Sequence, residues 1–325
     1  MADISETRVE RQPIGTDQDN VYDLIIIGAG PAGMSAAIYA ARGRIRTLLL
    51  EKAMPGGQVS NIWKIENYIG FPQGILGTEL TKRMEAHLSE FKVEKAWGYV
   101  SEIENMAAAI KCVKTDIGAK YYTRSVIIAS GLEPKKLNIP GEQRFRGRGV
   151  SYLATLDGHN YVGQTVAVIG GTSEAAESAL YLARFARKVI MIYPQSELQV
   201  VMMLKEKLMQ KSEIIDCMAN SVIEEIIGEA GVTDIQIRNR STDQIRVLQC
   251  SGIFVNIGKN PENRFLTKQV SLDEEGFVVC DAYNRTSVDG VFAAGDVRSK
   301  YLRQIATAVA DGALAAVMVD KYLNR

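Results

Sequence analysis

The apolar residues of this chain gather into short continuous runs separated by polar and glycine-rich segments. Four runs have the length and composition of a buried strand: Tyr22–Ile27 (YDLIII), Arg46–Leu50 (RTLLL), Thr165–Ile169 (TVAVI) and Lys188–Ile192 (KVIMI). Runs without polar alternation are typical of parallel strands that are buried on both faces. By contrast, residues 78–91 have the amphipathic spacing of a helix. The pattern predicts an α/β fold.

A glycine-rich turn follows the first strand directly. The segment GAGPAG begins at Gly28, and helix-forming residues continue from it, so strand, turn and helix come in the order that dinucleotide binding requires. Gly28 permits the tight turn, Gly30 lets the backbone approach a pyrophosphate, and Gly33 allows close packing of helix on strand. The helix N-terminus adds N–H groups and the positive end of the helix dipole. A dinucleotide would be held by Gly28, Gly30, Pro31, Ala32 and Gly33.

An acidic residue ends the second strand. Glu51, with Lys52 beside it, follows the run RTLLL, and a carboxylate at this position binds ribose hydroxyls. A GxGxxG motif alone is a weak signal. Its place between a buried strand and a helix, with an acid at the end of the next strand, predicts a nucleotide site.

The strand–glycine–helix pattern starts again about 140 residues later. The run TVAVI leads into GGTSEAAESALYLAR, and KVIMI follows as the next strand. This internal repeat predicts two Rossmann-like dinucleotide-binding domains, the second inserted in the first. The expected FAD-binding domain is split over residues 21–138 and 257–325, and residues 139–256 form the inserted domain, which resembles an NAD(P)-binding domain.

From Val21 onward, the chain resembles the low-molecular-weight thioredoxin reductases. The segments that carry this resemblance are GGQVSNIWKIENYIGFP, VIIASG, GRGVSYLATLDG and GVFAAGDV, followed by RQIATAVADGALAA. The resemblance implies that the first site binds FAD and that the protein is a homodimer. The flavin contacts that it implies are Gly57, Gln58, Asn67, Gly131, Gly295 and Asp296, with Arg303, Gln304 and Ile305 at the start of the last helix.

The redox-active dithiol of these reductases is missing here. Their two cysteines stand where this chain has Leu153 and Leu156, and leucine cannot supply the thiolate that attacks a disulfide. The two leucines instead leave an apolar surface, on which a planar ring such as a second flavin could stack. FAD could therefore be present twice in each chain.

Two polar residues follow the leucines, and two interpretations of each stay open. Asp157 matches the aspartate that donates a proton in thioredoxin reductases, so it could keep an acid–base role near the flavin. It could equally cap a turn with Gly158, which is a common use of Asp-Gly. His159 could be a proton shuttle or a packed turn residue.

The second glycine motif departs from the pattern of relatives that use NADPH. Thr172 stands where those relatives have glycine, and a β-branched side chain would crowd a pyrophosphate. Tyr193, Pro194 and Gln195 stand where they have His-Arg-Arg, so no cation is present for the 2′-phosphate. Both departures predict that NADPH binds weakly.

Composition excludes several other classes of protein. The 325 residues contain 38 Lys and Arg against 38 Asp and Glu, and this balance gives no support for a nucleic-acid or membrane partner. The four cysteines lie far apart in the sequence, without the spacing of a zinc site, and we expect no metal. Buried reduced thiols suit a cytoplasmic protein, although a long-range redox pair such as Cys217 with Cys250 stays open. Residues 1–20 are polar and are predicted to be a mobile tail.

These observations favour a FAD-dependent oxidoreductase that uses neither NADPH nor a CxxC relay. Its electron donor would be a protein such as ferredoxin, and a second flavin would stack on the first. Two alternatives are kept. One is an enzyme similar to the thioredoxin-reductase-like ferredoxin–NADP reductases, and the other is a non-catalytic FAD-bound scaffold or redox sensor.

Overall fold

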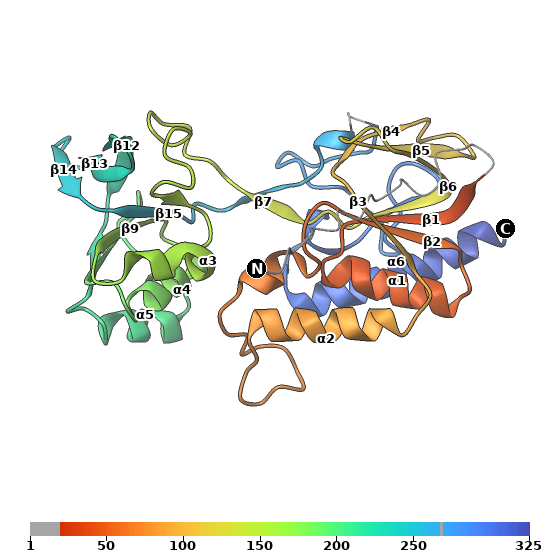
Figure 1. Cartoon of the computed structure of the whole chain (residues 1–325), viewed down its shortest axis with the longest axis horizontal. Helices are drawn as coiled ribbons and strands as arrows, with labels where there is room; N and C mark the ends of the chain where they lie inside the picture. The colour runs from red at the N-terminus through yellow and green to blue at the C-terminus, as the bar shows by residue number, and fades with distance from the viewer. Residues whose placement is uncertain (1–19, 267–268) are drawn as a thin grey trace, which may run out of the picture. The chain divides into compact units, whose positions relative to one another are not determined.

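The computed structural model describes residues 20–266 and 269–325, so the tail prediction falls almost wholly outside the described residues. The described residues form two compact units, and the chain of the second is inserted in that of the first (Figure 1). The first unit comprises the described residues up to Ser60, Glu66–Gly131 and Pro261–Arg325, and the second comprises Asn61–Ile65 and Leu132–Asn260.

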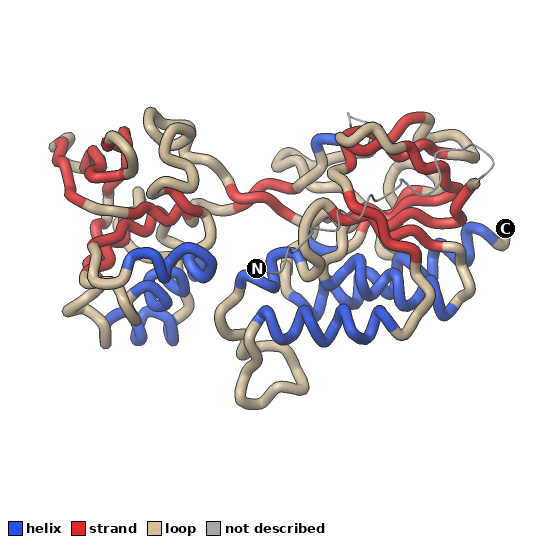
Figure 2. The backbone as a smooth tube through the Cα atoms, in the orientation of Figure 1, coloured by secondary structure: helices blue, strands red, loops and turns tan. Residues whose placement is uncertain are grey.

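The first unit is built on a seven-stranded sheet with the order β3-β2-β1-β6-β5-β4, in which β17 also pairs with β6. The strands are β1 (Val21–Ile27), β2 (Thr47–Glu51), β3 (Glu94–Trp97), β4 (Val100–Glu104), β5 (Lys111–Thr115), β6 (Lys120–Ile128) and β17 (Val291–Ala293). The helices α1 (Pro31–Arg42), α2 (Gly77–Ser89) and α6 (Ile305–Leu323) lie along one face of the sheet, as Figure 2 shows.

Strand β1 explains why its sequence shows no polar alternation. Leu24 and Ile26 belong to the core between the sheet and the helices, whereas Ile25 and Ile27 belong to the core on the opposite face. Both faces of the strand are therefore buried, as the continuous apolar run predicted. In parallel register, Ile27 lies opposite Leu50 of β2 on one side and opposite Ile128 of β6 on the other.

The second unit repeats this plan with a five-stranded parallel sheet of order β11-β10-β9-β15-β8. Its strands are β8 (Val150–Ser151), β9 (Thr165–Ile169), β10 (Lys188–Ile192), β11 (Ile215–Met218) and β15 (Gly252–Val255). One face packs on helices and the other on an antiparallel sheet. These covering elements are α3 (Ala154–Asp157), α4 (Ser173–Leu182) and α5 (Met202–Met209), and β12 (Ser221–Gly228), β13 (Val232–Asn239) and β14 (Ile245–Gln249).

The remaining elements are short. Strands β7 and β16 pair with each other along the two connections. Their bounds and those of the 3-10 helices are β7 (Leu132–Pro134), β16 (Lys259–Pro261), η1 (Gly57–Asn61), η2 (Gly158–Tyr161), η3 (Arg264–Leu266) and η4 (Gly295–Val297).

Helices α1 and α6 approach each other at backbone distance. A Cβ added to Gly312 of α6 would lie 2.0 Å from the carbonyl oxygen of Ala32 and 3.0 Å from the amide nitrogen of Ala36. Neither atom belongs to a flexible side chain that could move aside. Glycine at position 312 therefore sets the distance between the two helices.

Replacing Gly312 with alanine should destabilise the protein, although alanine is the better helix former by about 1 kcal/mol. The methyl group must push α6 away from α1, and overpacking of this kind costs about 1–3 kcal/mol. Denaturant unfolding of the variant measures this loss. Val317→Ala on the exposed side of the same helix is the control and should change stability by less than about 0.5 kcal/mol. A Gly312→Ala variant as stable as the wild type would refute the packing argument.

Candidate functional site

The turn after β1 is crowded on two sides and open on the third. Gly28 has a φ of +104°, and a Cβ there would lie 2.4 Å from the carbonyl oxygen of Ala129. A Cβ on Gly33 would lie 1.8 Å from the oxygen of Gly28. A Cβ on Gly30 would meet nothing within 4 Å, and its φ of −75° suits any residue. Gly30 is thus not required by packing, and it leaves free space at the N-terminus of α1.

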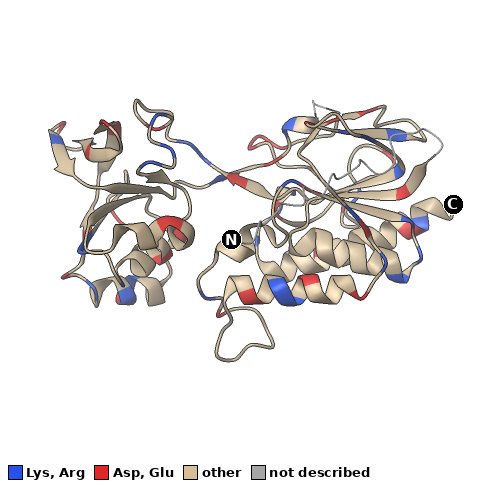
Figure 3. Cartoon of the chain, viewed as in Figure 1, with Lys and Arg blue, Asp and Glu red and all other residues tan. Residues whose placement is uncertain are grey.

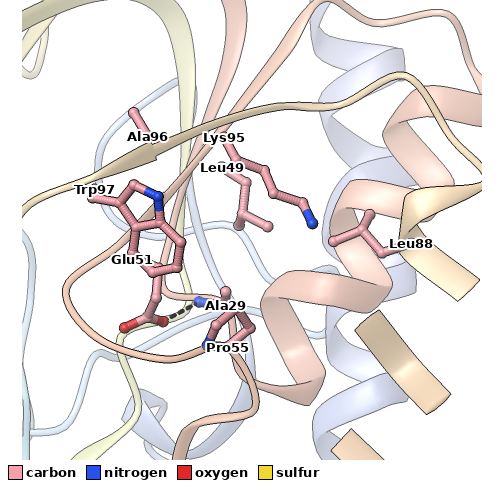
Figure 4. Close-up of a pocket in the computed structure, with 8 residues that line it drawn as sticks. All are labelled: Ala29, Leu49, Glu51, Pro55, Leu88, Lys95, Ala96 and Trp97. Carbon is pink, nitrogen blue, oxygen red and sulfur yellow. Dashed lines mark hydrogen bonds between the residues drawn. The ribbon is translucent and has the colours of Figure 1, made fainter. Parts of the chain in front are cut away.

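Glu51 stands at the carboxyl end of β2 and holds this turn. Its Oε2 accepts a hydrogen bond from the Ala29 amide at 2.7 Å, and its Oε1 accepts from the amides of Lys52 and Ala53 at 2.8 and 2.9 Å. Figure 4 shows the carboxylate at the edge of a small pocket that Trp97 also lines. The predicted ribose-binding acid therefore lies beside the predicted phosphate turn.

A buried carboxylate that the sequence reasoning missed organises the residues around Lys52. Glu262 is only 3% exposed, and its oxygens accept from Lys52 Nζ at 3.0 Å and from the Tyr99 hydroxyl at 2.9 Å. Its amide donates to the carbonyl oxygen of Gly131 at 3.0 Å. Lys52 and Gly131 are thereby linked through one acid, although they lie far apart in the sequence.

The predicted flavin residues at the start of α6 meet those of the loop after β2. Asn67 Nδ2 donates to Gln304 Oε1 at 3.0 Å, and Gln304 caps the helix that begins at Ile305. The ideal Cβ of Gly57 lies 3.3 Å from the Cα of Gly30, so this loop also reaches the first turn. Gln58 is half-buried in the same loop.

Arg303 and Asp311 fix the segment that carries Gly295 and Asp296. The Arg303 guanidinium stacks on the Phe277 ring at 3.8 Å, and its Nε donates to the carbonyl oxygen of Asp296 at 3.3 Å. Asp311 of α6 accepts from the Gly295 amide at 3.1 Å.

Two cations complete this arrangement around Asp311. The same carboxylate pairs with Arg298 at 2.6 Å and with Lys300 at 2.9 Å. Asp311 lies within RQIATAVADGALAA, one of the segments that resemble thioredoxin reductases. Its partners become evident only in the fold.

Leu153, Leu156 and the two polar residues that follow them lie in the second unit. Leu153 is half-buried and Leu156 is 57% exposed. Asp157 Oδ2 accepts from the Ser151 hydroxyl at 2.6 Å, and the Ser151 oxygen accepts from the Leu153 amide at 3.0 Å. The Asp157 carboxylate is thus held by a serine. His159 is exposed.

The second glycine turn has the backbone geometry of the first. Gly170 has a φ of +141°, and a Cβ there would lie 2.1 Å from the carbonyl oxygen of Asn256. Thr172 caps α4 with φ and ψ of −94° and 171°, close to the −75° and −175° with which Gly30 caps α1. The exposed Thr172 side chain therefore projects where the first turn has free space.

Two further differences surround the second turn. Glu174 lies in the first turn of α4 and pairs with Lys259 at 2.9 Å, whereas the corresponding residue of α1 is Ala32. Tyr193, which follows β10 as Glu51 ends β2, is 5% exposed and packs beside Gly171. The sequence reasoning missed Glu174, although its position in the repeated motif was available as a signal.

Three further observations concern the Cys250 thiol, metal binding and membrane spans. Burial raises the pKa of the Cys250 thiol to about 12, so its thiolate is strongly disfavoured. Among the described residues, no cluster of three or more His, Cys, Asp or Glu side chains is arranged to hold a metal ion. None of the described helices combines the length and apolar character that crossing a membrane requires.

Comparison with known proteins decides the family. A family model described as pyridine nucleotide-disulphide oxidoreductase matches residues 22–312. The thioredoxin reductase of Peptoclostridium litorale is 41% identical over 314 residues, which cover 94% of this chain and 98% of that protein. The chain belongs to the thioredoxin reductase-like group of this family. Like its relatives, it is a FAD-dependent oxidoreductase.

Solved structures of thioredoxin reductases share the fold. That of Lactococcus lactis is 40% identical with a TM-score of 0.88, over 93% of this chain and 99% of that one. The ferredoxin-flavin thioredoxin reductase of Clostridium acetobutylicum is 29% identical with a TM-score of 0.52, over 94% and 99% of the two chains. The predicted α/β fold with Rossmann-like domains is confirmed.

Replacing Gly30 with valine should give a folded protein without FAD. The side chain meets no protein atom within 4 Å at its first carbon, and the backbone conformation tolerates it. It fills the space where a pyrophosphate would approach the N-terminus of α1. The visible spectrum should lose its flavin bands, and the melting temperature should fall because bound FAD no longer contributes to stability. Fully yellow Gly30→Val protein would contradict the assignment of this turn.

Proposed function

We propose that this enzyme binds FAD in its first unit and receives its electrons from a protein donor instead of NADPH. The observation that supports this most directly is the contrast between the two glycine turns. One leaves free space beside a helix N-terminus at Gly30, and the other fills the same position with Thr172. The two turns are otherwise alike in backbone conformation. We therefore attribute the contrast to the ligand that each turn binds and not to the requirements of the fold.

The residues of the first unit suit FAD. In this proposal, the N–H groups of α1 face the pyrophosphate, and Glu51 accepts hydrogen bonds from ribose hydroxyls. The α6 N-terminus, with Gln304 and Ile305, supports the electron-rich edge of the ring system through its dipole. Bound FAD supplies the capacity to take up and pass on electrons. Arg303 and Asp311 hold the segment around Asp296 in place for this binding.

The second unit lacks the features that hold the phosphates of NADPH. Thr172 occupies the approach to the helix N-terminus, and the Glu174 carboxylate brings a negative charge to the first turn of α4. The Glu174 carboxylate would repel a phosphate that approached this turn. Lys259 is already paired with Glu174 and so does not offer its charge to a nucleotide. No arginine follows β10 to pair with a 2′-phosphate.

We further propose that electrons leave without a dithiol relay and that a second planar group, most simply a second flavin, binds against Leu153 and Leu156. Leu156 is exposed over more than half of its surface, and an exposed leucine is consistent with a flat apolar partner. Asp157, whose carboxylate accepts a hydrogen bond from the Ser151 hydroxyl, would then have its acid–base role beside this group. The homodimer and the cytoplasmic location are carried over from thioredoxin reductases as part of this proposal, and the ferredoxin-flavin relative suggests the class of donor.

NADPH at micromolar concentration should leave the flavin of the wild-type enzyme oxidised under anaerobic conditions. Each missing charge-assisted contact to a phosphate removes roughly 1.5–3 kcal/mol of binding free energy. Flavin absorbance during a stopped-flow titration measures the effect, with dithionite as the control that bleaches the ring directly. The variant Thr172→Gly with Glu174→Ser removes both obstacles and should bind NADPH more tightly than the wild type. Rapid bleaching of the wild-type flavin by NADPH would refute donor selectivity and favour the ferredoxin–NADP reductase-like alternative.

Flavin released by denaturation should approach two per chain after purification in the presence of excess flavin. The second equivalent should be lost from a Leu156→Asp variant, because a charge on this surface costs binding free energy that an apolar ring cannot return. The first equivalent should remain, which makes the variant its own control for folding. A ratio of one in the wild type, unchanged by added flavin, would reject the second flavin and leave a single-flavin enzyme.

A further inference from the structure

Residues 135–148 of the second unit form a strongly basic segment, which we term the basic loop. It contains five cations, all exposed, and its one carboxylate, Glu142, is buried. The cations are Lys135, Lys136, Arg144, Arg146 and Arg148. The whole chain carries no net charge, so this local excess is not a consequence of overall composition.

The backbone of the basic loop is fixed to the β12–β13 hairpin. Phe145 is 1% exposed and belongs to the core of the second unit. The Ile226 amide donates to the Pro140 carbonyl at 3.0 Å, and the Val232 amide donates to the Arg148 carbonyl at 3.1 Å. The cations are therefore presented from an ordered backbone, which reduces the entropy lost when a partner binds.

Glu142 connects the lysine-bearing part of the basic loop to Tyr152. Its oxygens accept from the amides of Leu137 and Asn138 at 2.8 and 2.7 Å, and from the Tyr152 hydroxyl at 2.7 Å. The guanidinium of Arg146 lies 5.8 Å from the centre of the Tyr152 ring. Glu142 thus links the backbone that follows the two lysines to Tyr152, whose ring lies near Arg146.

The charges of the basic loop are not compensated. Among the described residues, none of its five cations lies within ion-pair distance of a carboxylate. Arg144 and Arg148 donate only to backbone carbonyls, those of Glu229 and Arg144. Two partly buried cations of the same unit, by contrast, are paired: Arg238 with Glu224 and Lys188 with Asp216. Figure 3 shows blue segments gathered along this loop.

We propose that the basic loop is the docking surface for an acidic electron-carrier protein. This inference rests on the proposed function, in which a protein and not NADPH supplies electrons. Complementary charge accelerates encounter and orients a transient partner, and it does so without the large apolar interface that a permanent complex needs. A neutral chain with a locally basic loop fits a compact acidic protein better than a nucleic acid, which binds through many distributed phosphate contacts.

The probe for this test is a purified acidic [2Fe–2S] ferredoxin, prereduced photochemically for kinetics and oxidised for binding. Lys135→Gln, Lys136→Gln and Arg146→Gln are combined, because the structure gives these side chains no hydrogen bond that the change would break. Stopped-flow flavin absorbance gives the second-order rate constant for reduction at low and high salt. We expect the triple variant to lower this constant about tenfold or more at low salt and to flatten its salt dependence.

The matched control removes the same charge from the same unit. Lys211→Gln, Arg240→Gln and Arg246→Gln change three other exposed cations and should leave the rate constant within about twofold of the wild type, as expected for charges outside the contact surface. Flavin content and melting temperature of both triple variants should match the wild type, which separates docking from folding.

Binding of oxidised ferredoxin, measured by calorimetry, distinguishes this inference from the proposed function. Salt-sensitive binding that the basic-loop variant loses supports the docking surface, even if electrons do not reach the flavin and the proposed donor is wrong. Flavin reduction that neither salt nor the variant alters leaves the proposed donor in place and overturns the docking surface. Equal losses in both triple variants, no binding at all, or preferential binding of a DNA duplex would also overturn it.

Discussion

The close approach of three backbone segments at the carboxyl end of β1 governs the structure of the first unit. The turn at Gly28 lies between the ends of β2 and β6, with the Gly28 amide bonded to Leu50 and the Ala129 amide bonded to Ile27, both at 2.8 Å. At this spacing, a single added carbon at Gly28 or Gly33 would collide with a carbonyl group. Helix α1, which begins after this turn, then meets α6 at Gly312. The three glycines therefore fix the relative positions of β1, α1 and α6. The site that we assign to FAD is formed at the ends of these elements.

The second unit repeats the constraint and thereby separates packing from ligand binding. The Gly170 amide bonds to Ile192 at 2.9 Å and the Asn256 amide to Ile169 at 2.7 Å, which reproduces the contacts of the first turn. Glycine is needed at position 170 whether or not a nucleotide binds, because a carbonyl group lies where a side chain would begin. Position 172 corresponds to Gly30, where packing makes no demand. Threonine can therefore occupy it without cost to the fold, and the residue at this position reports on the ligand and not on the packing.

The strands and the turn chemistry were predictable because both are local. The runs at 165–169 and 188–192 are strands with those bounds, and the run at 22–27 extends by only one residue at its start. The helix expected at 78–91 is found at Gly77–Ser89. The partners of the site residues were not predictable. Glu262 is 210 residues from Lys52, and Asn67 is 237 residues from Gln304, so these contacts depend on the path of the chain through both units.

The clusters around Glu262 and Asp311 show how contacts between carboxylates and their partners hold the split first unit together. In each cluster, a carboxylate of the segment after the inserted unit holds a cation or a backbone amide: Glu262 holds Lys52, and Asp311 holds Arg298, Lys300 and Gly295. A carboxylate removed from water is stable only when its charge is paired and its lone pairs are used. Each acid therefore favours a single arrangement of its neighbours, and the Lys52 contact joins parts of the chain that the insertion separates. Both clusters lie within the first unit, so the second unit can differ in its ligand without disturbing them.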